Sequence, residues 1–128
     1  MLSKQERLKD RYLFNVAFNV GQKKKQKINT NLLSLYYLFK KKDINKFNTK
    51  ENLPKTAFIV GIRVDKKSTT RNLIKRRMRA AYKLVSKKLY NSGDNKLLAL
   101  IWIGNPPVKS ATFDQVKNLM ESILRRLI

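Results

Sequence analysis

The chain has 128 residues, of which 42% are hydrophobic, and its 30 Lys and Arg residues against 8 Asp and Glu residues give a net charge of +22. This length fits one domain, spanning residues 1–128, with enough apolar material for one modest core. The charge opposes compaction, so it predicts a polyanionic partner: nucleic acid, or alternatively an anionic membrane surface. The sequence contains no Cys and no His, which excludes disulfides, zinc fingers, thiolate catalysis and His-based acid–base catalysis.

We expect no catalytic residue and no metal site on the chain itself. The acidic residues are scattered singly, so the sequence shows no carboxylate pair of the kind that hydrolysis or metal binding requires. The longest apolar run, residues 97–103, is too short to span a bilayer, and the N-terminal stretch MLSKQERLKDRY lacks the apolar core of a signal peptide. These features predict a cytoplasmic protein that does not enter the membrane.

Apolar spacing predicts the elements of the first half of the chain. Residues 9–20 are expected to form a short helix, because apolar residues recur at helical spacing and Gly21 follows as a C-cap. After the basic turn QKKKQK, residues 31–39 (NLLSLYYLF) predict a strand. Residues 40–56 are rich in Lys, Asn and Thr and contain Pro54, so they predict a long, mobile hairpin loop.

Residues 57–64 (AFIVGIRV) predict a second strand, in which Gly61 would permit a close approach or a bulge. A helix is expected from about residue 70 to residue 89, with a cap provided by Ser68, Thr69 or Thr70.

The last part of the chain predicts a strand and a helix. Residues 97–104 (LLALIWIG) are apolar throughout, which predicts a strand buried on both faces, and the following NPP ends it. Residues 112–115 (TFDQ) resemble a capping box that opens a helix with one apolar face: Phe113, Val116, Met120, Ile123 and Leu127. The order of elements indicates an α+β fold in which helices pack on a small sheet.

The predicted helix at residues 70–89 has two chemically different faces. One carries an apolar stripe suited to a core: Ile74, Met78, Ala81 and Val85. The opposite face is cationic and polar: Asn72, Lys75, Arg76, Arg79 and Lys83. A solvated face normally mixes charge signs, whereas the stretch TTRNLIKRRMRAAYK has no acid and more Arg than Lys. Because guanidinium groups bind phosphate in a bidentate manner, this face predicts a surface for the backbone of RNA or DNA.

Aromatic residues suggest a second surface. Phe14 and Phe18 share one side of the first predicted helix, while Tyr36 and Tyr37 lie on opposite faces of the strand at residues 31–39. Two interpretations stay open for these rings. They form part of the core, or they line a groove that stacks with the bases of single-stranded nucleic acid, each base contributing about 1–3 kcal/mol.

These residues resemble a known family, the bacterial ribonuclease P (RNase P) protein component. The pattern R-N-x-x-K-R-x-x-R, which starts at Arg71, resembles the family signature. The family's opening pattern is present in register at residues 7–9 (RLK), followed by Phe14, Phe18 and Gly21. The segments LSLYYL, GIRVDKK and IWIGNPP follow in family order, so the resemblance covers nearly the whole chain outside the predicted loop.

The resemblance implies a single-domain α-β-β-β-α-β-α sandwich with a left-handed crossover, in which helices pack on a small, mostly antiparallel sheet. It also implies the non-catalytic protein subunit of a ribonucleoprotein endoribonuclease, which removes the 5′ leader from precursor tRNA. The RNA subunit would perform the hydrolysis and bind most of the Mg²⁺. We expect a monomeric protein within this ribonucleoprotein.

The resemblance also assigns residues to each RNA partner. The residues expected to contact the catalytic RNA are Arg71, Asn72, Lys75, Arg76 and Arg79, to which we add Lys83, Lys66 and Lys67. Those expected to line a cleft for the single-stranded leader are Phe14, Phe18 and Tyr36, with Lys23, Lys24 and Lys25 as peripheral phosphate contacts.

The sequence departs from the family pattern at two places. Leu73 replaces the second Arg of the usual R-N-R, so that contact is expected to be lost. The turn KKSTT is shorter than is usual, so the path of the chain into the basic helix is not transferred from the family. The alternative function is that of a non-catalytic, ribosomal-type structural RNA-binding protein. A membrane-surface protein is disfavoured, because the apolar stripe of the helix lacks Trp and Phe.

Overall fold

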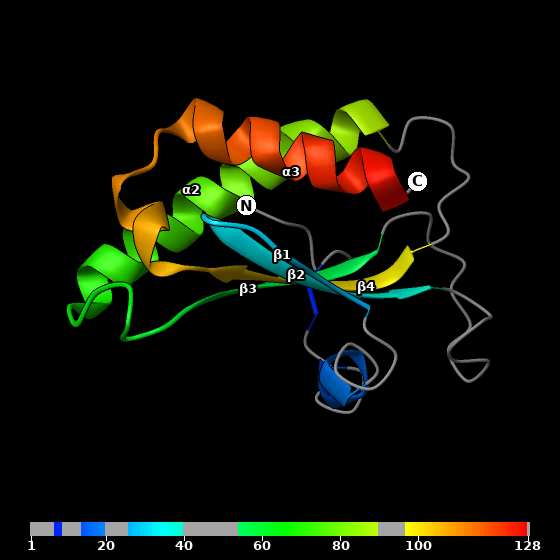
Figure 1. Ribbon diagram of the computed structural model, residues 1–128, viewed down its shortest axis with the longest axis horizontal. Helices are drawn as coiled ribbons and strands as arrows, with labels where there is room; N and C mark the ends of the chain where they lie inside the picture. Colours follow the sequence, from blue (N-terminus) through cyan, green and yellow to red (C-terminus); the bar gives the residue numbers. More distant parts are fainter. Residues whose placement is uncertain (1–6, 9–13, 20–25, 40–53, 90–96, 128) are drawn as a thin grey trace.

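The computed structural model describes residues 7–8, 14–19, 26–39, 54–89 and 97–127. They form a four-stranded sheet with helices on both faces (Figure 1). The strands are β1 (Lys27–Asn29), β2 (Leu33–Phe39), β3 (Lys55–Val60) and β4 (Leu97–Gly104). The helices are α2 (Ser68–Leu89), the 3₁₀ helix η1 (Pro106–Ser110) and α3 (Phe113–Leu127), and residues 14–19 are also helical. The predicted α+β class and the α-β-β-β-α-β-α order are confirmed.

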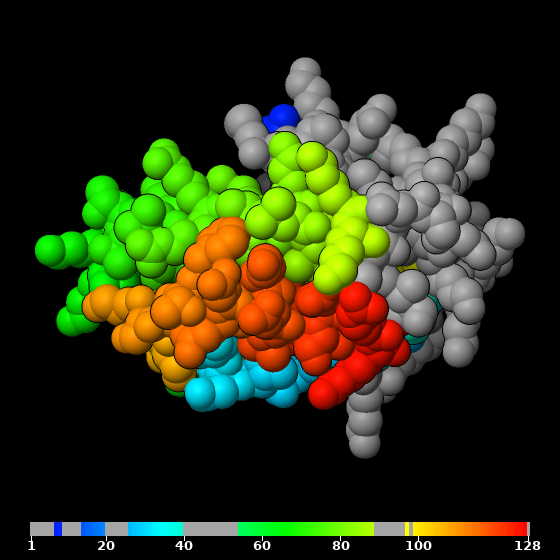
Figure 2. All heavy atoms as spheres, turned by 90° about the horizontal axis from the view of Figure 1, so that it is seen from above, coloured from blue at the N-terminus to red at the C-terminus, as the bar shows by residue number. Residues whose placement is uncertain are grey.

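The helices divide between the two faces of the sheet. α2 and α3 lie side by side over one face, and the helix at residues 14–19 lies against the other (Figures 1 and 2). Successive side chains of β2 point to opposite faces of the sheet, so this strand contributes to a core on each face. Leu33 and Leu35 belong to the larger core under α2 and α3. Tyr36 and Leu38 belong to the smaller core beside residues 14–19. Each face of the sheet therefore has a helix-covered core.

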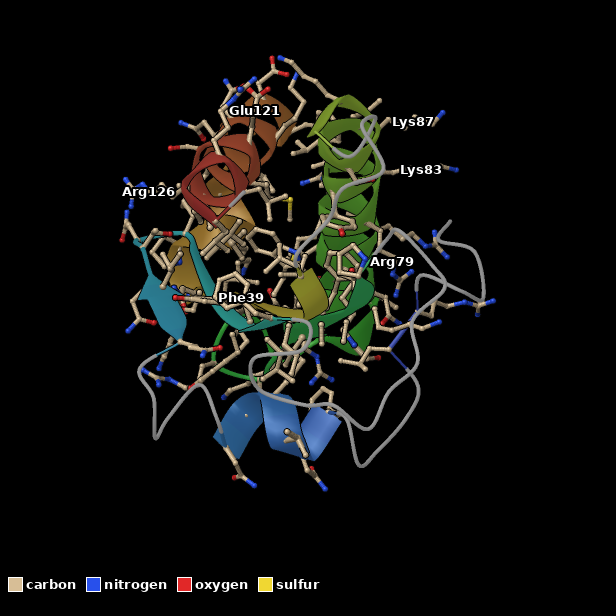
Figure 3. All side chains as sticks on the ribbon, turned by 90° about the vertical axis from the view of Figure 1, so that its right-hand side faces the viewer. Phe39, Arg79, Lys83, Lys87, Glu121 and Arg126 are labelled. Atoms are coloured by element: carbon tan, nitrogen blue, oxygen red, sulfur yellow. The ribbon has the colours of Figure 1, made fainter. Side chains whose placement is uncertain are left out.

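The strands are ordered β1-β2-β4-β3, with β1–β2 and β2–β4 antiparallel and β3–β4 parallel. The parallel pair is connected through α2. Viewed from the side of α2 with β3 pointing upward, β4 lies to the left of β3 (Figures 1 and 3). The crossover is therefore left-handed, as predicted, against the general preference for right-handed connections.

β4 occupies the position that its composition predicts. It lies between β2 and β3, with Leu100 and Trp102 in the larger core and Ala99 and Ile101 in the smaller one. All four side chains are fully buried. The predicted bounds and the burial on both faces are confirmed.

The orientation of α2 follows from its buried side. The predicted apolar stripe is confirmed, since each of its residues is at most 4% exposed: Ile74, Met78, Ala81 and Val85. Tyr82 extends this side, because its hydroxyl accepts a hydrogen bond of 3.1 Å from Thr56 Oγ1 and its ring packs against Phe58 and Trp102. These contacts determine which side of α2 faces away from the sheet.

The segment between β3 and α2 differs from its prediction. β3 begins at Lys55, inside the predicted loop, and ends at Val60. The next residues form a turn in which the Val64 N–H donates to the Gly61 carbonyl at 3.1 Å. A side chain at Gly61 would meet no atom within 4 Å, so the predicted close approach is wrong.

The start of α2 also differs. The helix begins at Ser68, two residues before the predicted start at residue 70, so all three predicted cap residues lie inside its first turn. Instead, the Lys67 N–H donates to Asp65 Oδ1 at 2.8 Å, so a carboxylate before the helix holds the turn.

Other differences concern the first half of the chain. β1 forms from the end of the basic stretch QKKKQK and was not predicted, and β2 starts at Leu33 instead of at residue 31. Of the helix predicted at residues 9–20, the structure shows residues 14–19 as helical. The remaining positions of that helix, Gly21, Lys23 to Lys25 and residues 40–53 of the predicted loop lie outside the described residues.

The capping box of α3 is confirmed. The Gln115 N–H donates to Thr112 Oγ1 at 3.2 Å, and the Thr112 N–H donates to Gln115 Oε1 at 2.9 Å. The predicted apolar face also holds, since Val116, Met120 and Ile123 are buried against the larger core, joined by Leu124.

Replacing Met78 with Ala tests the buried stripe of α2. Met78 is fully buried, so Met78→Ala should lower the free energy of unfolding by about 2–5 kcal/mol through lost burial and a new cavity. Leu84 lies on the exposed side of the same helix and is 53% exposed, so Leu84→Ala should change it by about 0.5 kcal/mol or less. Urea unfolding of both variants measures this, and equal losses would contradict the orientation of α2.

Candidate nucleic-acid interface

The predicted RNA-binding residues of α2 lie together on one side of the helix, and we call this set the basic ridge: Arg71, Asn72, Lys75, Arg76, Arg79 and Lys83. Leu84 and Lys88 of α2 lie on the side toward α3, and helical spacing places the ridge on the opposite flank. Figure 3 shows Arg79 and Lys83 on this flank, together with Lys87, which was not predicted.

The ridge has two rows that differ in burial. Arg71, Lys75 and Arg79, four residues apart, are half-buried at the level nearest the sheet. The outer row is exposed and contains Asn72, Arg76 and Lys83. Long basic side chains can bury their apolar stems while their charged ends stay in water, which fits the intermediate burial of the inner row.

The described carboxylates do not neutralise the basic ridge. α2 contains no acidic residue. Within the described residues, the ion pairs of Asp65 and Glu121 are made with cations outside the ridge: Lys109, Lys88 and Arg125. Like charges at four-residue spacing repel by a few tenths of a kcal/mol per pair. This repulsion is therefore not relieved by the described part of the chain, and an external anion would relieve it.

Asp65 organises the segment that leads into α2. Its carboxylate accepts the Lys67 N–H through Oδ1 and pairs with Lys109 Nζ through Oδ2 at 2.6 Å. The hydrogen bond from Lys109, and then that from the Lys67 N–H, hold the pKa of Asp65 below its ordinary value. Lys66 and Lys67, both predicted to bind RNA, are exposed in this segment, directly before the ridge.

The structure brings the three predicted leader-binding rings together on the opposite side of the molecule. The ring centroids of Phe14 and Phe18 are 5.0 Å apart, and those of Phe18 and Tyr36 are 4.7 Å apart. Phe14 and Phe18 are half-buried, whereas Tyr36 is 5% exposed. The two interpretations are therefore compatible: Tyr36 belongs to the smaller core, while both Phe rings keep accessible surface.

Lys27 belongs to the same surface and was missed. Its Nζ lies 5.0 Å from the centroid of the Tyr36 ring, in a cation–π contact. The basic stretch QKKKQK was the available signal, but only the pairing of β1 with β2 places Lys27 opposite Tyr36. Lys27 is exposed, so this surface combines a cation with the partly accessible Phe14 and Phe18 rings.

Two further positions near the basic ridge in sequence are exposed. Arg63 is exposed in the turn before α2 and was missed because that turn was predicted as part of a strand. Leu73, at the position where the family usually has Arg, is 46% exposed. Leu73 therefore adds an apolar side chain, and no charge, beside Asn72.

Neither a metal cluster nor a membrane span is found in the described residues. They contain no group of three or more acidic residues placed to hold a metal ion. Among the same residues, no helix combines the length and the apolar character needed to cross a membrane.

The sequence matches a known protein family. A family model described as Ribonuclease P matches residues 2–128. No curated protein matches the chain in sequence.

Several solved structures share the fold. The RNase P protein of Staphylococcus aureus superposes with a TM-score of 0.66 at 20% identity, covering 95% of this chain and 94% of that chain. A mutant of that protein, described as having defective mRNA degradation activity, gives 0.69 at 19% identity and covers 97% and 89% of the two chains. Another structure of the S. aureus protein gives 0.59 at 24% identity, with 98% and 91% covered.

The ion pairs of Glu121 predict a pH-dependent stability. The hydrogen bond from Lys88, the largest cause, and that from Arg125 lower the pKa of Glu121 from its ordinary value of 4.5. A lowered pKa in the folded state stabilises the protein above the ordinary pKa, and this contribution disappears as the pH falls through the folded-state pKa. The difference in unfolding free energy between the wild type and Glu121→Gln should therefore be present at about pH 7 and should shrink at a lower pH, below the ordinary pKa of 4.5. A difference that persists at the lower pH in urea titrations would contradict this account.

Proposed function

Since the chain belongs to the Ribonuclease P family, which makes it a subunit of the tRNA-processing enzyme ribonuclease P, we propose that it binds the catalytic RNA of that enzyme and the 5′ leader of precursor tRNA. The basic ridge of α2 carries this proposal. Its Arg and Lys residues follow one flank of a helix and have no carboxylate partner among the described residues. A line of cations with no acid among them suits the negatively charged backbone of an RNA strand.

The protein contributes binding, and we assign the chemistry to the RNA. A magnesium ion requires oxygen ligands, chiefly carboxylates. Two of the three acids in the described residues, Asp65 and Glu121, are already paired with cations, and the third, Asp114, lies apart in the first turn of α3. The described residues therefore do not fit a magnesium site. We place Mg²⁺ on RNA phosphates, where the basic ridge would reduce repulsion between enzyme and substrate.

We assign the basic ridge to the catalytic RNA and the aromatic cluster to the leader. The basic ridge lies on the face of the sheet covered by α2, and the aromatic cluster of Phe14, Phe18 and Tyr36 lies on the opposite face. Separate faces allow one protein to contact the catalytic RNA and the leader at the same time. We propose that a monomer acts in this way within a cytoplasmic ribonucleoprotein.

Removing the cations of the basic ridge tests the first contact. Arg76→Ala combined with Arg79→Ala should weaken binding to a bacterial RNase P RNA and lower the slope of log affinity against log salt by about 0.7–0.9 for each lost phosphate contact. For a protein that makes 6–10 such contacts, affinity should fall roughly 10³–10⁵-fold between 50 and 200 mM salt. Arg126→Ala, which removes an exposed cation at the end of α3, is the control. An unchanged salt slope in the double variant would refute the ridge as the RNA-binding surface.

Replacing Phe14 tests the leader contact and separates this function from that of a ribosomal-type structural protein. Phe14→Leu keeps apolar burial but removes a stacking ring, so it should weaken binding of precursor tRNA by about 1–3 kcal/mol and leave binding of mature tRNA unchanged. Phe14→Tyr should restore the affinity. If Phe14→Leu weakens both substrates equally, or only lowers the melting temperature, the ring belongs to the core and the alternative function gains support.

A further inference from the structure

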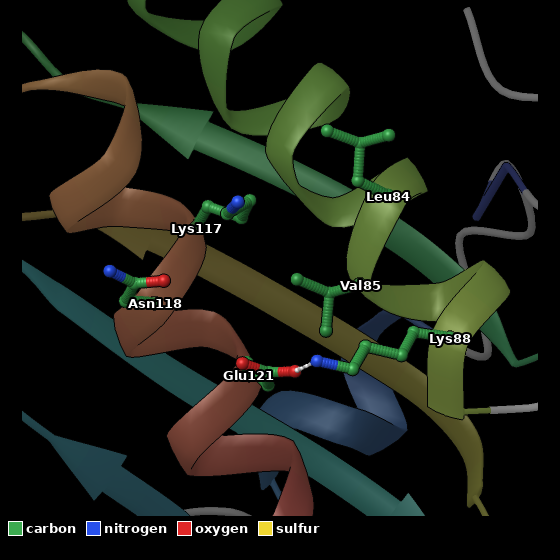
Figure 4. Close-up of a pocket in the computed structure, with 6 residues that line it drawn as sticks. All are labelled: Leu84, Val85, Lys88, Lys117, Asn118 and Glu121. Carbon is green, nitrogen blue, oxygen red and sulfur yellow. Dashed lines mark ion pairs between the residues drawn. The ribbon is translucent and has the colours of Figure 1, made fainter.

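The flank of α2 that faces α3 contains a groove (Figure 4). Its lining residues are Leu84, Val85 and Lys88 from α2 and Lys117, Asn118 and Glu121 from α3. Its volume is about 340 Å³, near the lower end of the roughly 300–1,000 Å³ range of small-molecule sites. The groove therefore has room for a ligand of about the size of one nucleotide.

The groove favours an anion. Lys88 from α2 and Lys117 from α3 line it, and Glu121 is the one acid among its lining residues. Glu121 is already engaged by Lys88 at 2.6 Å and by Arg125 at 3.3 Å. Lys117 has no carboxylate partner within the described residues and leaves α3 on the side that faces α2 (Figure 4). Two lysines and one carboxylate line the groove, and Arg125 also pairs with that carboxylate, so the groove carries an excess of positive charge.

The apolar part of the groove indicates more than a free phosphate. Leu84 is 53% exposed at the rim, beside the buried Val85. An exposed leucine adds nothing to the binding of an inorganic ion, whereas the flat face of a base or ribose would cover it. Asn118 supplies both a donor and acceptors for the edge of a base. Phosphate, apolar and hydrogen-bonding contacts are thus available within one nucleotide-sized space.

We propose that the groove between α2 and α3 binds one unstacked nucleotide of an RNA strand. This inference rests on the proposed function, because the RNA that lies along the basic ridge would supply the nucleotide. α2 would then contact RNA on two flanks, with the ridge on one side and the groove on the other. An acidic peptide would also suit the lysines, but a groove that accommodates a single nucleotide-sized group favours the RNA already placed on the same helix.

Neutralising Glu121 gives a test in which a structural role and a binding role have opposite signs. Glu121→Gln releases Lys88, so it should strengthen binding to RNase P RNA roughly threefold to tenfold even though it removes an ion pair that stabilises the fold. Asp114→Asn removes the same charge from α3 outside the groove and is the matched control. The proposal is refuted if Glu121→Gln binds the RNA no more tightly than Asp114→Asn.

Neutralising Lys117 gives the converse test. Lys117→Gln should lower the affinity and reduce the salt slope by about 0.7, the value for one contact to a single strand. Arg126→Gln removes an equal charge from the end of α3, outside the groove, and should leave the slope unchanged. Equal losses in both variants would mean that only net charge matters and would overturn the proposal.

Site-directed crosslinking locates the contact directly. Because the sequence contains no Cys, Asn118→Cys and Lys83→Cys each introduce a unique thiol for a photoactivatable crosslinker. In the reconstituted holoenzyme, both positions should form adducts with RNA, at different nucleotides. An adduct from position 83 alone would reject the groove while leaving the proposed function intact. Adducts from neither position would reject both.

Discussion

The structure depends on the packing of one side of α2 against the sheet. Tyr82 packs on Phe58 of β3 and Trp102 of β4, and Ile74 and Met78 are buried in the larger core. The helix therefore cannot rotate about its axis without exposing apolar surface. The cations of the same helix are held in a line on its outer flank as a consequence. The basic ridge repels itself in the folded state, and hydrophobic burial offsets the cost of that repulsion.

The position of the few described carboxylates supports the same account. Asp65 and Glu121 pair with cations that hold η1 near the start of α2 and α3 against its end. Both acids stabilise the scaffold and leave the ridge unpaired. A protein that used its acids to neutralise α2 would gain stability but lose affinity for a polyanion. The distribution of charge is therefore better suited to binding than to stability alone.

Much of this arrangement follows from the sequence. β4 was predicted with correct bounds because its apolar run ends at turn residues, and the capping box located α3. The predicted start of α2 was two residues late. The turn before the helix is held by Asp65, whose partner Lys109 belongs to a distant part of the chain. β1 has no sequence signal of its own and forms because β2 offers a free edge.

Among the surfaces, those that depend on local sequence spacing could be predicted, and those that depend on tertiary packing could not. The basic ridge could be predicted, because helical spacing alone places Arg76 and Lys83 on one flank. Lys27 and the groove beside Lys117 could not, because the first depends on strand register and the second on how α2 packs against α3. The parallel pairing of β3 with β4 was implied only by the family resemblance, since periodicity along a strand carries no information on its neighbours.

A structure of this protein bound to a bacterial RNase P RNA tests the central claim most directly. We expect RNA phosphate oxygens within hydrogen-bonding distance of the Arg76 and Arg79 guanidinium groups, with the apolar side of α2 still packed on the sheet. A complex in which both guanidinium groups face solvent and the RNA lies on another surface would contradict it.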